Sequence, residues 1–149
     1  MKTKIHSISG GIAFITILIF WTSTVYTELF SSHESISTVK TLILKGMLIL
    51  IPAMVIVGGS GMSLAKRRTA KIIGVKKKRM PIIAATGLLV LLPAAFYLEM
   101  KASNGSFDTS FYIVQVIELI AGLSNLRLMA LNIKAGLRLT GKLKRISTH

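Results

Sequence analysis

Four apolar runs, each long enough to cross a lipid bilayer as a helix, constrain this chain more than any other feature. They cover about residues 7–30, 39–65, 80–100 and 110–133. A bilayer core requires about 20 consecutive, mostly apolar residues in α-helical form. In lipid the backbone polar groups must be satisfied within the segment, so the helix is the stable state of an isolated apolar run. The runs therefore predict an all-α integral membrane protein with four transmembrane helices.

The composition agrees with this interpretation. Hydrophobic residues make up 52% of the 149 residues, and the mean hydropathy is +0.66. A soluble domain of this size has too little interior to bury so many apolar side chains. The length fits a single domain, residues 1–149, and short connections favour antiparallel neighbours. We expect an antiparallel up-down four-helix bundle.

Basic residues collect at one end of the expected bundle. The loop 66–79 holds eight Lys and Arg and no acid, and the tail 134–149 and the N-terminus add more. By the positive-inside rule, such basic connections remain in the cytoplasm. We therefore expect a multi-pass protein of the bacterial inner membrane with both termini in the cytoplasm. A cleaved signal peptide is the alternative for the first run, and it predicts the same orientation.

The basic loop also predicts contacts with the lipid bilayer. Clusters of Lys and Arg beside a transmembrane helix attract anionic headgroups. The residues expected to make these contacts are Arg67, Arg68, Lys76, Lys77, Lys78 and Arg79. In a soluble chain the net charge of +14 would indicate nucleic acid, but basic residues between apolar runs are typical of membrane proteins. No nucleic-acid partner is expected.

Two helical faces carry polar and small residues at alternating spacings of three and four. The fourth-run seam consists of Gln115, Glu118, Gly122, Asn125, Met129, Asn132 and Gly136. The first-run seam consists of His6, Ser9, Ala13, Thr16, Phe20, Ser23 and Thr27. Polar residues are costly against lipid, whereas between helices they can pair and pack closely. Both seams are expected to face the interior of the bundle or a partner protein.

Glu118 is the clearest candidate for a functional side chain. Counting along the runs places Lys45 at a comparable depth, which predicts an intramembrane ion pair with Ser23 and Gln115 nearby. Such a pair has either a functional role or the structural role of fixing helix register. A second expected cluster, near the cytoplasmic face, contains His6, Asn125 and Asn132.

No catalytic set and no metal site is predicted, and the absence of cysteine excludes thiolate ligands. No cofactor is predicted either, although haem b is an alternative. In outline the chain resembles a small membrane b-type cytochrome, with His6 as one haem ligand. Met129 or His6 of a second copy would be the other ligand, because His/Met ligation occurs in cytochromes.

Three prolines and one turn give local predictions. Pro52 and Pro93 lie inside apolar runs and should kink their helices, since proline removes a backbone donor. Pro81 is expected in the first turn of the third helix, where that donor is not needed. Asn104 and Gly105 predict a tight turn.

The leading functional prediction is a non-enzymatic accessory, assembly or interaction subunit that forms a homo- or hetero-oligomer through the two seams. It rests on inward polar faces without any catalytic set. One alternative is transport of protons or a small solute by the Glu118–Lys45 pair. The other is a haem-b redox protein.

Overall fold

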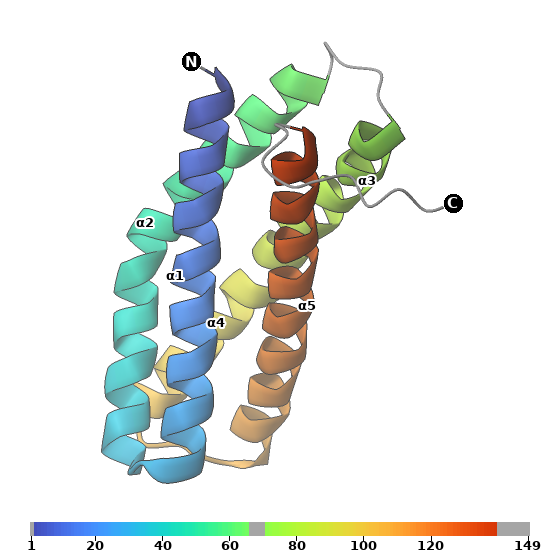
Figure 1. The fold of residues 1–149 in the computed structure, drawn as a ribbon. Coiled ribbons are helices and arrows are strands. Elements are labelled where there is room, and N and C mark those ends of the chain that lie inside the picture. The colour runs from blue at the N-terminus through green and yellow to red at the C-terminus, as the bar shows by residue number, and fades with distance from the viewer. Residues whose placement is uncertain (1, 66–70, 140–149) are drawn as a thin grey trace.

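The computed structural model describes residues 2–65 and 71–139, and the regular structure within these ranges is helical throughout. The elements are α1 (Lys2–Phe30), α2 (His33–Ala65), α3 (Lys71–Thr86), the π-helical turn η1 (Gly87–Leu91), α4 (Leu92–Ser103) and α5 (Thr109–Leu139). Because α3, η1 and α4 follow one another as a single rod, the chain forms a bundle of four rods (Figure 1). The all-α four-helix prediction is confirmed.

The rods alternate in direction, so the two short connections lie at one end of the bundle (Figure 1). We call this the hairpin end. The start of α1, the end of α2, the start of α3 and the end of α5 lie at the opposite end, which we call the terminal end (Figure 1). Among the described residues, α1 packs against α2 and α5, and α4 packs against the same two helices. The pairs α1–α4 and α2–α5 therefore lie across the diagonals of the bundle.

The connection from α1 to α2 contains only two residues, Ser31 and Ser32. The Ser32 hydroxyl caps α2 by accepting the backbone N–H of Ser35 at 3.4 Å. Serine is favoured at this position because its side chain satisfies a donor that the first turn leaves free. As a result, α2 begins at His33, six residues before the start expected from hydropathy.

The connection from α4 to α5 is fixed at its first residues by a helix-terminating turn. Gly105 has a φ of 66°, and its N–H donates to the Ala102 carbonyl at 3.0 Å. The N–H of Ser106 donates to the Lys101 carbonyl at 2.9 Å. This pair of bonds is the Schellman arrangement, in which glycine adopts the left-handed conformation without strain. The predicted turn at Asn104 and Gly105 is confirmed.

Asp108 fixes the other end of this connection as the N-cap of α5. Its Oδ1 accepts the Phe111 backbone N–H at 3.0 Å and the Ser110 hydroxyl at 2.6 Å, while Lys101 donates to Oδ2. The hydrogen bonds from Lys101, Ser110 and Phe111 hold the pKa of the Asp108 carboxyl well below its usual range. Asp108 thus remains ionised and ties α4 to the start of α5.

Prolines shape two of the rods. At Pro93 the missing N–H and the crowding ring disturb the preceding turn. There the backbone widens into η1, and the Leu92 N–H bonds to the Gly87 carbonyl five residues earlier. Pro52 lies inside α2, which changes direction near the middle of its length (Figure 1). The position expected for Pro81 was wrong: α3 begins at Lys71, within the expected loop, and Pro81 is inside the helix.

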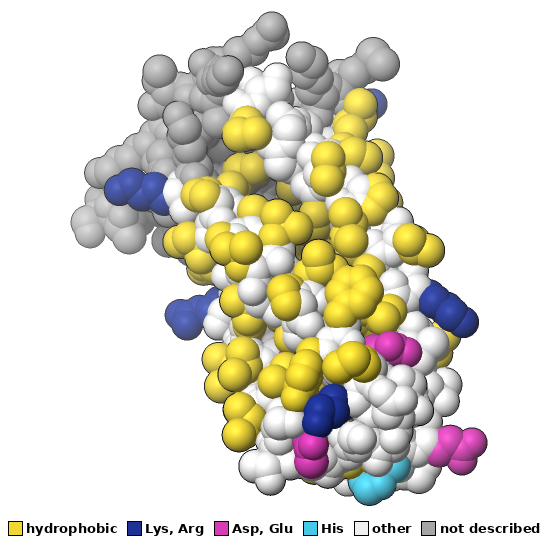
Figure 2. Space-filling view, turned by 180° about the vertical axis from the view of Figure 1, so that it is seen from behind, with side chains coloured by type: hydrophobic (Ala, Val, Ile, Leu, Met, Phe, Trp, Pro, Cys, Tyr) yellow, Lys and Arg dark blue, Asp and Glu magenta, His cyan; other side chains and the backbone are white. Residues whose placement is uncertain are grey.

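The exterior of the bundle is apolar. Large side chains such as Leu48 and Leu89 are 78% and 74% exposed. Figure 2 shows hydrophobic side chains across the middle of one face, with acidic and histidine side chains toward the hairpin end. Four segments are long and apolar enough to cross a membrane: Thr3–Phe30, His33–Ser63, Lys78–Ser103 and Thr109–Arg138. The architecture is that of a multi-pass membrane protein.

Close contact between α1 and α2 depends on a small residue at Gly46. A Cβ added there would lie 2.5 Å from Cζ of Phe20, inside van der Waals contact. The Phe20 ring therefore packs directly on the α2 backbone. Small residues at helix contacts are the usual means of close approach in membranes.

We expect Gly46→Ala to destabilise the bundle relative to the matched variant Gly58→Ala. Both replace a glycine within α2, but no atom lies within 4 Å of a Cβ added at Gly58. Because Ala gains about 1 kcal/mol of helix propensity at either site, the difference isolates overpacking, which costs about 1–3 kcal/mol. Unfolding by SDS in detergent, followed by fluorescence of the single tryptophan Trp21, measures it. Equal stability of the two variants would contradict the packing described here.

Candidate functional site: a buried charged cluster

Both polar seams face the interior. None of their fourteen residues is exposed, and Ser9, Ala13, Gln115, Asn125 and Asn132 are among the buried ones. The Trp21 indole N–H, beside the first-run seam, donates to the Leu119 carbonyl of α5 at 3.0 Å. Its Cδ1 would lie 3.1 Å from a Cβ added at Gly122. The seams thus pack within this chain.

An ion pair crosses the centre of the bundle near the hairpin end. Nζ of Lys40, on α2, lies 2.9 Å from Oε2 of Glu118, on α5. Nε2 of Gln115 donates to the same oxygen at 2.9 Å. The Lys40 side chain is 2% exposed and that of Glu118 is 13% exposed. Because α2 and α5 are diagonal partners without close backbone contact, the long side chains of this pair join them directly.

The partner predicted for Glu118 was therefore the wrong lysine. Lys45 is exposed on the outside of α2, and neither ion pair among the described residues includes it. The error arose from the helix start. Because α2 begins at His33, Lys40 already lies about 10 Å along it, close to the depth of about 13 Å for Glu118 in α5. Lys40 also shares the buried face that contains Ile36 and Ile43.

Glu28 adds a second carboxylate to this site. It is half-buried near the end of α1, and the charges of Lys40, Glu118 and His33 act on it. Its Oε1 is buried and accepts no hydrogen bond. The Oε1 of Gln115 is also buried and also accepts no hydrogen bond. The cluster thus contains two carboxylates, one ammonium group and two buried oxygens without donors, which is a costly arrangement in a medium of low polarity.

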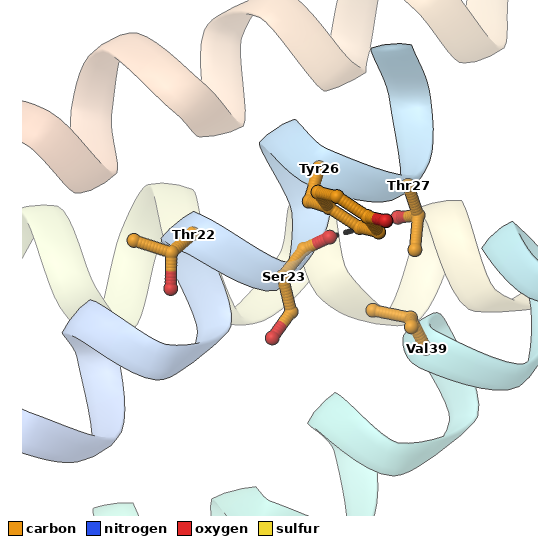
Figure 3. A pocket seen from close by; sticks show the side chains of 5 residues that line it. All are labelled: Thr22, Ser23, Tyr26, Thr27 and Val39. Atoms are coloured by element: carbon orange, nitrogen blue, oxygen red, sulfur yellow. Dashed lines mark hydrogen bonds between the residues drawn. The ribbon is translucent and has the colours of Figure 1, made fainter. Parts of the chain in front are cut away.

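Ser23, expected in this cluster, instead lines an open recess of about 410 Å³ between α1 and α2. The other lining residues are Thr22, Tyr26, Thr27 and Val39 (Figure 3). The Thr27 hydroxyl donates to the Ser23 carbonyl at 2.9 Å. The recess lies at the level of the charged cluster, because Thr27 and Val39 directly precede Glu28 and Lys40.

The structure separates the three residues expected in a second cluster. His6 Nδ1 and the Ser60 hydroxyl are 3.0 Å apart at the terminal end. Asn125 donates from Nδ2 to the Ile83 carbonyl at 3.3 Å, beside the π turn η1. Asn132 is buried, and its Oδ1 has no hydrogen-bond partner.

His6 and Met129, which were considered as haem ligands, lie at different depths along the bundle. Met129 packs in the core cluster with Ala13, which is seven residues beyond His6 on α1, or about 10 Å for a helix. Met80 lies closer to His6: both approach Gly61, whose added Cβ would be 3.1 Å from Met80 Sδ and from His6 Cε1.

The residues predicted to contact lipid headgroups fall into three groups. Arg67 and Arg68 lie outside the described residues. Lys76 and Lys77 belong to the helical backbone of α3. Lys78 is exposed and Arg79 is half-buried, both in α3 near the terminal end. Their contacts with lipid stay a prediction.

Sequence reasoning missed Lys40, Glu28 and the Trp21 hydrogen bond. A signal for Lys40 was present, because Ser32 followed by acidic Glu34 is typical of a helix start. That start would have placed Lys40 seven residues into α2. Glu28 offered no comparable signal, since its direction depends on how α1 rotates against α2 and α5.

The fold and the buried pair together define a class: a multi-pass membrane bundle with an ion pair in its interior. No protein-family model, no curated protein and no solved structure matches this chain.

The two lysines should differ sharply in their contribution to stability. We expect Lys40→Met to lower the free energy of unfolding by about 3–5 kcal/mol, because it leaves the Glu118 carboxylate buried without its ion-pair partner. Lys45→Met should change it by less than about 0.5 kcal/mol in detergent, since the side chain is exposed.

The double variant Lys40→Met/Glu118→Gln should recover part of the loss, because the uncompensated charge is removed. The SDS unfolding assay with Trp21 fluorescence compares all four proteins. A larger loss for Lys45→Met than for Lys40→Met would contradict the assignment of the pair.

Proposed function

We propose that this protein is a non-enzymatic subunit of a bacterial inner-membrane assembly. In this proposal it binds a different transmembrane protein through the outward face of α2. The observation that carries the proposal is the exposed Lys45. The two seams, first considered as the partner surface, are occupied inside the bundle, so the partner must use another face.

Lys45 lies deep within its span. It is twelve residues after His33, the first residue of α2, which corresponds to about 18 Å along the helix. The membrane segment His33–Ser63 has its midpoint at residue 48, so Lys45 lies about 4.5 Å from the centre of its segment. A lysine at the centre of a lipid-facing helix costs about 2.5–3.5 kcal/mol on insertion scales. An acidic side chain of a neighbouring helix would offset this cost.

A second copy of the chain does not supply that acid. Glu34, Glu99 and Asp108 lie at or near the hairpin end, far from the depth of Lys45. Glu28 lies two residues before the end of α1, and Glu118 is already held by Lys40 and Gln115. In a dimer whose copies share one orientation, Lys45 would remain unmatched. The expected partner is therefore a different protein with an Asp or Glu near the middle of a transmembrane helix.

The face around Lys45 has the form of a helix-packing stripe. Exposed residues follow at alternating spacings of four and three along α2: Thr38, Leu42, Lys45, Ile49, Pro52 and Ile56. We call this set the Lys45 stripe. It is apolar except at Thr38 and Lys45, so a partner helix can pack along it and place one carboxylate at Lys45. The charge complementarity supplies register as well as attraction.

A photo-crosslinking amino acid at Leu42 or Ile49 in membranes of the source organism tests this surface. We expect one discrete adduct with a protein that carries an acid at matching depth. The adduct should be lost in the Lys45→Met background and kept with Lys45→Arg. The probe at exposed Ile120 of α5 is the matched control and should give no such adduct. An adduct between two copies of the chain, or one that is insensitive to Lys45→Met, would overturn the proposal.

The proposed orientation places the terminal end in the cytoplasm, where its Lys and Arg residues meet anionic lipids. Because the chain has no cysteine, single cysteines can report it directly. In intact spheroplasts an impermeant maleimide should label Asn104→Cys, at the exposed hairpin end. It should label Thr3→Cys, which is also exposed, only after the membrane is permeabilised. The reverse pattern would contradict the orientation.

A further inference from the structure

The charged cluster near the hairpin end does not balance its own charge. With all groups ionised, Glu28 and Glu118 carry two negative charges and Lys40 carries one positive charge. The ammonium group of Lys40 is 2.9 Å from Glu118, and Gln115 donates to the same Glu118 oxygen. The two donors are thus directed at Glu118. Glu28 is left as the carboxyl group without a hydrogen bond at its buried Oε1.

A second observation indicates that a ligand belongs at this place. The Gln115 side chain is buried, with the residue only 3% exposed, and its Nε2 is fixed on Glu118. Its Oε1, on the same amide group, is buried without a donor. The cluster thus contains two buried acceptor oxygens without donors and one uncompensated negative charge, and a proton on Glu28 would remove that charge.

The residues fit a proton better than a metal ion. Among the described residues no group of three or more His, Asp or Glu side chains is arranged to hold a metal. A proton requires only one carboxyl oxygen, and its uptake makes Glu28 neutral and balances the cluster. A recess whose lining includes Thr22, Ser23, Tyr26 and Thr27 lies at the same level of the bundle (Figure 3).

We propose that Glu28, framed by the Lys40–Glu118–Gln115 network, is a proton-binding site of this protein. The carboxylate takes one proton from water at the hairpin end and releases it to the same side. Helix α1 packs against α2 and α5, and the charged groups that act on Glu28 are Lys40 and His33 of α2 and Glu118 of α5. The hydrogen bonds from Lys40 and Gln115 both end on Glu118, whereas the buried Oε1 of Glu28 receives none. Protonation of Glu28 changes the formal charge of the cluster from −1 to zero.

Proton uptake by the purified full-length protein in detergent tests this site. The pH is stepped from neutral to mildly acidic, above the range near 4 in which exposed carboxylates titrate. The wild-type chain should take up about one proton more per chain than Glu28→Gln, because the amide cannot bind it. Both proteins also carry His33→Gln, because the charge of His33 acts on Glu28 and its own proton uptake would otherwise differ between them. Glu34→Gln, which removes an exposed carboxylate, is the matched control and should match the wild type.

Infrared difference spectra identify the group. The acid step should produce the C=O band of a protonated carboxyl in the wild type and in Glu34→Gln, and not in Glu28→Gln. If Glu28→Gln does not fold, Glu28→Asp is measured in its place. The C=O band should remain, and the pH at which it reaches half of its intensity should shift. Equal proton uptake by the wild type and Glu28→Gln would overturn the proposal. So would a C=O band whose pH midpoint is the same in Glu28→Asp as in the wild type.

Discussion

Polar side chains that face lipid raise the free energy of a membrane protein, so those of this chain are placed between the helices. Leu48 and Leu89 can face the bilayer at no cost, whereas Asn125 and Gln115 cannot. Both seams follow from this requirement, because their alternating spacing of three and four gathers polar groups on a single face of each helix. Packing one seam toward the other then gives the bundle its arrangement, with Trp21 of α1 bonded to the backbone of α5.

The Lys40–Glu118 ion pair lies in the interior of the bundle and links two of its helices. It joins α2 and α5, which lie diagonally and have no close backbone contact. A buried pair contributes little net stability over an apolar replacement, but loss of one partner is costly, so it fixes the relative register of the two helices. Asn125 has a comparable role toward the third rod, where it bonds to the Ile83 carbonyl beside the π turn that Pro93 imposes.

Two lysines five residues apart on α2 meet opposite surroundings. Lys40 is among the most buried side chains, and Lys45 is exposed on the apolar exterior. An advance of five residues takes a helix through one full turn plus about 140°, which is enough to move a side chain from the core to the lipid. The inner lysine belongs to the charged cluster around Glu28, and the outer one to the surface proposed for a partner. Helix α2 thus contributes one lysine to the interior of the bundle and one to its exterior.

The sequence by itself determined the four helices, the antiparallel bundle, the inward direction of both seams and the turn at Gly105. Each depends on local chemistry: apolar length, residue spacing, or the conformational freedom of glycine. Tertiary structure decided which lysine meets Glu118, that Glu28 joins them, and that His6 bonds to Ser60. These contacts depend on where α2 begins and on how the helices rotate against one another. An error of a few residues in a helix start changes both the depth and the direction of a side chain, and hydropathy does not resolve a start within polar residues such as those at 33–38.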